Sequence, residues 1–375
     1  MPGETAVETP QQPQSEVVEK KDIVEAEAKE AEASEKKDEE KKEKETADKA
    51  KADKAKKVKP PPPPPVHKKD FEKDVVYVYQ FNRSPTVPSV SPYCLKLESW
   101  LKLQQIKYEN VNHNGKLRSK RGLLPFVEYN GEEIADSEFI IKTLSEKLDK
   151  NMDEGMGKDQ LGVQHAMVAM VDNHLNWCLM QWFNRDMNDT IKGFQINLQQ
   201  MTGSKLPNGL LNFMMKHTYF RKNMKRLKAA GFACYTNDEV DEMGKADLKV
   251  LSELLGEKEF FFGDEPRSLD LKAFVWLAMM LNVDDSVKCP LRDFIKEECP
   301  NLVGVYTRMK DRAWGDHWEE ATGEKLDMNP HIPKPEPPKE EEKKEDEKEK
   351  DEEKKEEEAK ENKDEEKEKD NKEDK

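Results

Sequence analysis

The sequence predicts a mixed α/β domain followed by an all-helical domain, with a charged tail on each side of this pair. Strand-type and helix-type segments alternate between residues 75 and 150, and strand signals nearly vanish after Lys150. The segments before residue 74 and after residue 326 are rich in Glu and Lys and poor in apolar side chains. Such a composition cannot bury enough apolar surface to offset the conformational entropy of the chain, so we expect both tails to be disordered.

The net charge of the chain is concentrated in these tails. Of the formal charge of −15, residues 339–375 carry −8 and residues 1–74 carry −3, which leaves −4 for the middle. The disordered tails are predicted over residues 1–73 and 327–375. The run Pro60–Pro65 in the first tail is expected to form a polyproline II spacer, with docking to an SH3-type groove as the alternative.

Cysteine spacing and hydropathy argue against a disulfide-stabilised protein and against a membrane-spanning protein. The five cysteines are widely spaced and include no Cys-x-x-Cys pair, which argues against a disulfide scaffold and for a reducing compartment. The longest apolar run, residues 273–281, is far shorter than the ~20 residues that a membrane span needs. The polar, acidic N-terminus resembles neither a signal nor a transit peptide. We therefore expect a soluble cytoplasmic protein without a transmembrane segment.

The first domain is predicted to fold in the order strand, helix, strand, strand, helix. Val75–Phe81 is dense in β-branched and aromatic residues and is expected to be the first strand. A loop rich in Pro and Ser follows, and Pro92 stands at the start of an apolar helix pattern that continues to Leu103. Ile106–Val111 is the expected second strand.

A hairpin with an unusual proline comes next. Phe126–Tyr129 is the third expected strand, and Asn130 and Gly131 are the residues that a type I′ hairpin turn favours because both adopt positive φ. Pro125 cannot donate to a strand ladder and stands directly before the strand. The Leu124–Pro125 bond is predicted to be cis.

Asp136 and Ser137 follow this hairpin, directly before the helix-spaced apolar residues of 139–144. Side-chain acceptors there can cap the helix, and free N–H groups at a helix N-terminus can also bind an anionic ligand. Helix capping and ligand binding are both open interpretations of this pair.

The second domain is predicted to be all-helical. The expected helices are Leu161–Phe183, Leu210–Ala230, Val240–Leu255 and Leu271–Leu281. Asp270 precedes the last of these, but Arg267 stands where Ser or Thr would complete a capping box. This departure weakens the match to a capping box and leaves Ser268 as an alternative cap.

The strand and helix order, the proline before the third strand and the Asp-Ser pair resemble the N-terminal half of cytosolic glutathione transferases. The resemblance implies a glutathione transferase-like fold, with an α/β thioredoxin-like N-terminal domain over residues 74–150 and an all-α C-terminal domain over residues 158–326. The stretches Ser91–Leu101 and Asp172–Trp177 are similar to the failed-axon-connections and metaxin branch of transferase-like proteins. This branch implies a role in axon or neuronal development.

The family resemblance also implies a glutathione site. A cis-proline in these enzymes exposes the backbone of the preceding residue to the thiol of glutathione, which points to Leu124 and Pro125. Asp136 and Ser137 would hold the γ-glutamyl group. Ser91 stands in place of the first cysteine of a Cys-Pro-Tyr-Cys motif and is the candidate catalytic residue, because a serine there can donate a hydrogen bond to the thiolate but cannot exchange disulfides.

Other interpretations of these residues remain open. Ser91 could act as a helix cap alone, and Ser84 and Ser89 are rival thiol contacts in the preceding loop. Cys94 is expected to be a small buried residue rather than a nucleophile. No metal is expected, since the histidines do not cluster in the sequence. The basic stretch Arg221–Lys228 is expected to be solvated, with acidic lipid or a partner as the alternative.

Three functions are consistent with the sequence. The first is a transferase-like protein that acts in axon development through protein partners, with weak or absent catalysis. The second is an active glutathione transferase that conjugates glutathione to electrophiles, and the third is a metaxin-like component of a membrane-associated assembly. We expect protein partners of a neuronal signalling or cytoskeletal kind, a homodimer as one arrangement, and no nucleic acid. An axonal or peripheral membrane location is the alternative to a purely cytoplasmic one.

Overall fold

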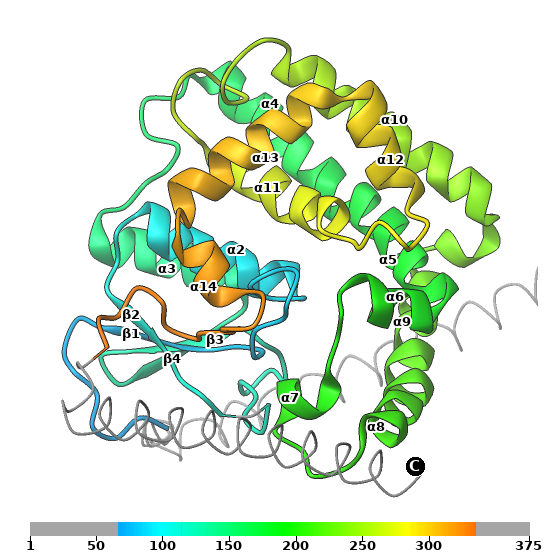
Figure 1. Ribbon diagram of the computed structural model, residues 1–375. Coiled ribbons are helices and arrows are strands. Elements are labelled where there is room, and N and C mark those ends of the chain that lie inside the picture. The colour runs from blue at the N-terminus through cyan, green and yellow to red at the C-terminus, as the bar shows by residue number, and fades with distance from the viewer. Residues whose placement is uncertain (1–66, 114, 335–375) are drawn as a thin grey trace, which may run out of the picture. The chain divides into compact units, whose positions relative to one another are not determined.

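The computed structural model describes residues 67–113 and 115–334 (Figure 1). Most of both predicted tails lies outside the described residues. The elements of the first domain are β1 (Val76–Tyr79), α2 (Pro92–Leu103), β2 (Tyr108–Asn110), β3 (Phe126–Tyr129), β4 (Glu132–Ala135) and α3 (Ser137–Leu148). The structure follows the predicted order strand, helix, strand, strand, helix with one strand more, β4, which is the second arm of the predicted hairpin.

In the rest of the described chain the regular elements are helices, apart from one isolated β-bridge between Phe260 and Gly263. They are α4 (Lys158–Met170), the π-helical η1 (Val171–Leu175), α5 (Asn176–Arg185), α6 (Met187–Gly193), α7 (Leu198–Thr202), α8 (Asn208–Met215), the π-helical η2 (Lys216–Phe220), α9 (Arg221–Ala229), the 3₁₀-helical η3 (Phe232–Cys234), α10 (Asn237–Leu255), α11 (Ser268–Leu281), α12 (Pro290–Glu298), α13 (Pro300–Ala313) and α14 (His317–Ala321). The predicted α/β domain followed by an all-helical domain is confirmed.

The four strands form one mixed sheet in the order β2-β1-β3-β4. β1 runs parallel to β2 and antiparallel to β3, and β3 pairs with β4 as a hairpin. Asn130 and Gly131 at the turn of this hairpin have φ values of 48° and 83°, as the type I′ prediction requires.

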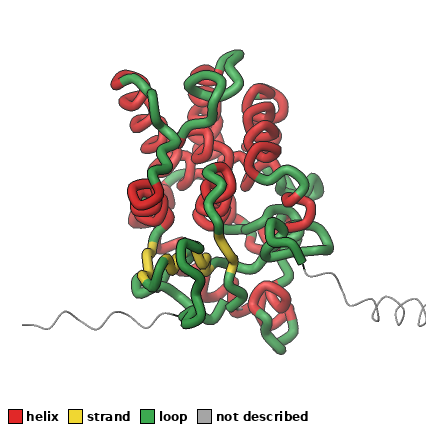
Figure 2. Tube along the Cα trace, turned by 90° about the vertical axis from the view of Figure 1, so that its left-hand side faces the viewer, coloured by secondary structure: helices red, strands yellow, loops and turns green. Residues whose placement is uncertain are grey.

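Both faces of β1 are buried, because its side chains alternate between two apolar clusters. Val76 and Val78 belong to the main core with α2 and α3, whereas Tyr77 and Tyr79 belong to a smaller cluster on the other face. In the side view of Figure 2 the strands have helices above them and loops below and beside them. The unbroken β-type run of the sequence is therefore explained by burial on both faces.

The segment before β1 covers part of the second face. The buried carboxylate of Glu128 accepts hydrogen bonds from the backbone N–H groups of His67 (2.7 Å) and Lys68 (3.0 Å) and from the hydroxyl of Tyr79 (2.7 Å). The predicted first tail, residues 1–73, thus includes residues that contact the sheet.

The segment after residue 326 lies along the free edge of β2. The Asn329 side chain accepts from Asn110 N–H (2.7 Å) and donates to Asn110 C=O (3.0 Å), as a neighbouring strand would. The His331 ring stacks on Tyr108 with a centroid separation of 3.9 Å. The predicted boundary at residue 326 therefore leaves out a segment that contacts the sheet.

Helix α11 is the buried centre of the helical domain and contacts α2 and α13 (Figure 1). Asp270 accepts hydrogen bonds from the N–H groups of Arg267 (2.8 Å) and Phe261 (2.9 Å), which fixes the turn before the helix. Ser268, the alternative cap, does not cap α11, because it is the first helical residue and its hydroxyl donates to Asp153 (2.7 Å).

Candidate functional site

The predicted proline bend is present at the start of β3. The Leu124–Pro125 peptide bond is cis, as predicted. In the β3–β4 hairpin Phe126 pairs with Ala135, so Pro125 and Asp136 are the next pair outward at the end of the antiparallel ladder. Pro125 and Asp136, which are eleven residues apart in the sequence, are therefore neighbours at the end of the hairpin.

Asp136 is held in an unusual backbone conformation at the N-terminus of α3. It has φ 81° and ψ 125°, outside the regions that a non-glycine residue ordinarily adopts. Its carboxylate accepts a hydrogen bond from Glu138 N–H (3.0 Å), and Ser137 is buried. Such conformations cost ~1–3 kcal/mol and cluster at functional sites, so this feature favours a ligand-binding role in addition to the observed capping.

Ser91 occupies the N-cap position of α2, but its hydroxyl does not cap the helix. Its side chain makes no cap hydrogen bond and is half-buried. The hydroxyl instead lies beside the thiol of Cys94, where hydrogen bonds from Ser91 and Ser89 act against the effect of burial. Burial dominates and raises the pKa of Cys94 to about 11, so this thiol is protonated at neutral pH.

The two rival serines are inaccessible. Ser84 and Ser89 are both fully buried. The Ser84 hydroxyl donates to Val87 C=O (2.9 Å), and the Ser89 hydroxyl accepts from Ser91 N–H (3.3 Å). Among these three serines, only Ser91 is placed where a ligand can reach it.

A cluster of charged side chains joins the two domains beside this site. Glu138 in the first turn of α3 accepts from Lys96 of α2 (2.5 Å) and Lys272 of α11 (2.6 Å), and Lys272 also pairs with Asp172 of η1 (2.8 Å). Both lysine side chains are almost completely buried. The cluster fixes the N-terminal turn of α3, and with it Asp136, against the helical domain.

The pKa values of the groups in this cluster are shifted in different directions from their usual values. Burial alone would raise the pKa of Glu138, but the two ammonium groups lower it to about 2. Burial, together with the neighbouring Lys272 ammonium, lowers the pKa of Lys96 to about 8. Burial opposes the charge of Lys272 as well, yet Glu138 and Asp172 raise its pKa overall. Lys272 is thus the firmly charged member of this pair of lysines.

Sequence reasoning missed this cluster, although a signal was present. Lys96 lies between Leu95 and Leu97, and Lys272 follows Leu271, so each charge interrupts an apolar run. A charge within an apolar helix is expected to be paired. The pairing partners are too distant in sequence to be read from the pattern.

Tyr93 lies beside the same cluster. It is 44% exposed, and its ring meets the ring of Trp276 edge-on at a centroid distance of 6.2 Å. Burial first and then the Asp172 carboxylate raise the pKa of Tyr93, and Lys272 and Asp136 are also among the charges that act on it. Tyr93 of α2 is therefore close to charged groups of both domains.

One group of side chains in the described part of the chain could hold a metal ion. His174, Cys178 and Asp247 place one ligand atom each within 4.8 Å of one another. His174 Nδ1 and Asp247 Oδ2 are already hydrogen-bonded at 2.6 Å, and burial raises the pKa of the Cys178 thiol to about 12. The sequence signal that was overlooked is the i, i+4 spacing of His174 and Cys178 on one helical stretch.

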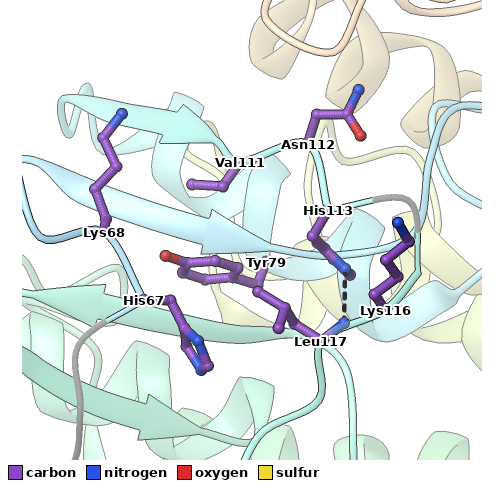
Figure 3. A pocket seen from close by; sticks show the side chains of 8 residues that line it. All are labelled: His67, Lys68, Tyr79, Val111, Asn112, His113, Lys116 and Leu117. Atoms are coloured by element: carbon purple, nitrogen blue, oxygen red, sulfur yellow. Dashed lines mark hydrogen bonds between the residues drawn. The ribbon is translucent and has the colours of Figure 1, made fainter.

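A separate pocket of about 380 Å³ lies next to the second face of the sheet (Figure 3). Its lining includes Tyr79, His67 and Lys116, and the His113 ring accepts a hydrogen bond from Leu117 N–H (3.2 Å). None of the predicted glutathione-site residues lines it.

Comparison with known proteins places the chain in a class. The family model of the glutathione S-transferase N-terminal domain matches residues 92–188, and that of the glutathione S-transferase C-terminal domain matches residues 244–309. Together with the architecture, these matches show a glutathione S-transferase-like fold.

Within this class, the chain is a relative of Failed axon connections of Drosophila melanogaster. The two are 51% identical over 275 residues, which is 72% of this chain and 65% of the relative. The chain thus spans less than two thirds of the length of that relative. The resemblance to the failed-axon-connections group is confirmed.

The comparisons also found more distant similarities. The chain is 24% identical to an isoprene-epoxide–glutathione S-transferase of Rhodococcus sp. strain AD45 over 63% of this chain and 98% of the relative. It is 26% identical to Metaxin-1 of Macaca fascicularis over 44% of this chain and 52% of the relative. A glutathione S-transferase of Ceriporiopsis subvermispora, solved in complex with glutathione, covers 64% of this chain and 97% of its own at 15% identity, with a TM-score of 0.43.

Proposed function

We propose that this protein acts in axon or neuronal development through protein partners, on a transferase-like scaffold with weak or absent catalysis. The 51% identity to Failed axon connections carries the proposal. The site chemistry supports it, because Ser91 replaces the nucleophilic cysteine of redox-active relatives of this fold. The nearby Cys94 thiol is buried with a pKa of about 11 and is unsuited to thiol chemistry at neutral pH.

The test of this proposal is functional rescue. Neurons that lack the protein are expected to show defects in axon projection. The Ser91→Ala variant should correct these defects as well as the wild-type chain does, because the proposed function needs the folded surface and not thiol activation. If the Ser91→Ala variant is present at normal levels and does not correct the defects, the result would favour the second candidate, an active glutathione transferase.

The proposal includes a glutathione site formed by Leu124, Pro125, Asp136 and Ser137. The γ-glutamyl carboxylate would meet the free N–H groups at the N-terminus of α3, and the cysteinyl amide would pair with the backbone of Leu124. The adjacency of Pro125 and Asp136 in the hairpin and the strained conformation of Asp136 support this arrangement.

Retention on immobilised glutathione and titration calorimetry test the site. Asp136→Ala should weaken glutathione binding at least tenfold. Asp186→Ala is a matched control, because Asp186 is also an N-cap residue that accepts one helix N–H, from Asn188 at 2.8 Å, but at the remote helix α6. Equal binding by both variants would remove the proposed site.

An active glutathione transferase is the second candidate, and the similarity to the Rhodococcus transferase favours it. In this case Ser91 would activate the thiol, so Ser91→Ala would lower the conjugation rate and leave glutathione affinity nearly unchanged. We expect low turnover in the wild type, and ordinary transferase turnover would reverse the order of the two candidates.

A metaxin-like role in a membrane-associated assembly is the third candidate, supported by the similarity to Metaxin-1. No helix in residues 67–113 and 115–334 has the length and apolar character to cross a bilayer. For this third candidate we propose a cytoplasmic or axonal location with peripheral membrane contact. A homodimer also fits the transferase-like fold, and sedimentation velocity of the full chain tests it.

A further inference from the structure

Helix α8 exposes apolar side chains along its whole length. None of its residues is buried, although most of them are apolar. Leu210, Phe213 and Met214, spaced i, i+3 and i+4, are 45%, 58% and 48% exposed and lie on one side of the helix. Leu206 before the helix and Tyr219 after it are 43% and 47% exposed. The apolar patch is defined as Leu206, Leu210, Phe213, Met214 and Tyr219, and exposed apolar side chains gathered on one short segment are typical of a contact surface.

Exposed cations flank these apolar residues in the sequence. No Asp or Glu occurs between Asp189 and Asp238, in a chain whose formal charge is −15. The exposed basic residues nearest the patch in the sequence are Lys205, Lys216, Arg221, Lys222 and Lys225. An acid-free stretch of this length in an acidic protein concentrates positive potential on one segment of the molecule.

The apolar and basic parts belong to one helical arm. α8, η2 and α9 follow one another without a break, since the junction residues Lys216 and Arg221 have right-handed helical dihedrals. In Figure 1 the α8 end of this arm lies away from α10 to α13. The basic–apolar arm is defined as residues 205–229. Its apolar residues Leu210, Phe213 and Met214 and its basic residues Arg221, Lys222 and Lys225 are exposed.

We propose that the basic–apolar arm docks on an anionic lipid surface. A bilayer leaflet supplies both complements at once, because anionic headgroups pair with the cations while Phe213, Met214 and Leu210 enter the headgroup–acyl boundary. A second copy of the arm would bring like charges together. An acidic peptide would pair with the cations and leave the apolar patch in water.

The inference deepens the proposed peripheral membrane contact and does not depend on glutathione binding. The full chain is tested by co-sedimentation with vesicles of phosphatidylcholine alone and of phosphatidylcholine with phosphatidylserine. Binding is expected only with phosphatidylserine and should weaken as salt is raised, because the charged contacts are solvent-accessible.

Two variants separate the apolar and charged contributions. The double variant Phe213→Gln, Met214→Gln should weaken binding at least tenfold. The triple variant Arg221→Gln, Lys222→Gln, Lys225→Gln should weaken it about a hundredfold, at about fivefold per charge. The control for the apolar variant is Val250→Gln, because Val250 is an exposed apolar residue of α10. The control for the charge variant changes the exposed residues Lys249, Lys258 and Lys288 together to Gln. Both controls should bind the vesicles as the wild type does.

Several results would overturn the inference. They are equal binding to both kinds of vesicle, no binding to either, or equal losses in the variants and their controls. Sedimentation velocity supplies a further criterion. A homodimer that dissociates in the Phe213→Gln, Met214→Gln variant would show that a second copy, and not lipid, covers the patch. Glutathione affinity should be unchanged in every variant, which keeps this test separate from that of the glutathione site.

Discussion

Glu98 in α2 is a fully buried carboxylate with a complete set of hydrogen-bond donors. Arg83 donates to both of its oxygens at 2.7 Å, and Gln80 (2.7 Å), Asn110 (2.9 Å) and Tyr108 (3.0 Å) also donate to it. Burial alone would raise the pKa of Glu98, but the Arg83 guanidinium and the hydrogen bonds lower it to about 2. A buried charge of this kind is stable only while its partners are present.

We expect Arg83→Gln to destabilise the protein by about 3–5 kcal/mol, because Glu98 would remain as an uncompensated buried charge. Urea denaturation followed by tryptophan fluorescence measures the change. Arg185→Gln is the matched control, since Arg185 forms a similar two-pronged pair with Asp241 (2.8 and 2.6 Å) but is less buried. A loss in Arg83→Gln no larger than that of the control would contradict this account.

The same pair predicts a pH dependence. The pKa of Glu98 is about 2 in the folded state, against a usual 4.5, so its stabilising contribution is present above pH 4.5. It is lost as pH falls from 4.5 towards 2, because the unfolded state binds the proton first. Glu98→Gln should therefore reduce the slope of unfolding free energy against pH in this window by up to about 1.4 kcal/mol per pH unit. A slope identical to that of the wild type would show that Glu98 does not titrate differently on folding.

At the scale of elements, the start of α11 determines how the two domains meet. Asp270 fixes the turn before the helix, and Ser268 and Arg267 hold the interdomain loop through Asp153 (2.7 Å) and Met152 C=O (2.9 Å). Because α11 contacts α2 of the first domain, its register affects both domains.

Asp270→Ala should cost about 2–3 kcal/mol of stability, because two N–H groups, one of them buried, would lose their acceptor. Chemical denaturation measures the loss. Thr236→Ala at the exposed capping box of α10 is the comparison and should cost only about 1 kcal/mol. Equal losses at the two caps would show that the burial of Asp270 adds nothing.

The segment after residue 326 acts as a cover for the edge of β2. Met328 C=O and Asp327 C=O accept hydrogen bonds from Arg83 at 2.6 and 2.9 Å, in addition to the pairing of Asn329 with Asn110. Asn329→Ala should lower the unfolding free energy by about 1–2 kcal/mol, since the Asn110 N–H would lose its acceptor. The control is Asn301→Ala, because Asn301 is also half-buried but pairs with Ser252 within the helical domain. An equal loss of stability in both variants would show that the pairing with β2 has no effect of its own.

At the scale of the whole molecule, limited proteolysis tests the extent of the folded unit. Trypsin should cut first at the lysines of the two predicted tails and leave a core of about residues 67–334, which includes the contacts of His67 and Asn329. Mass spectrometry defines the ends of this core. Early cuts within residues 160–320 would contradict a single stable unit. A core that ended at residue 326 would show that the cover of β2 opens readily.

The sequence by itself determined the order of elements and the parts of the candidate site. Hydrophobic period, turn residues and proline position are local signals, and they led to the strands β1, β2 and β3, the Asn130-Gly131 turn and the cis bond before Pro125. The order of the strands in the sheet was not among these predictions. They failed to show the π-helical turns η1 and η2, because a π-turn inserts one residue into a pattern that remains helical.

Only the tertiary structure decided which distant groups meet. Glu138 and Lys272 are separated by 134 residues, and Asn110 and Asn329 by 219 residues, yet each pair is hydrogen-bonded. The choice among Ser84, Ser89 and Ser91 also depended on burial, which is set by neighbours from other elements. Local patterns fix backbone conformation because its energetics involve adjacent residues, whereas ion pairs and burial depend on the packing of the whole chain.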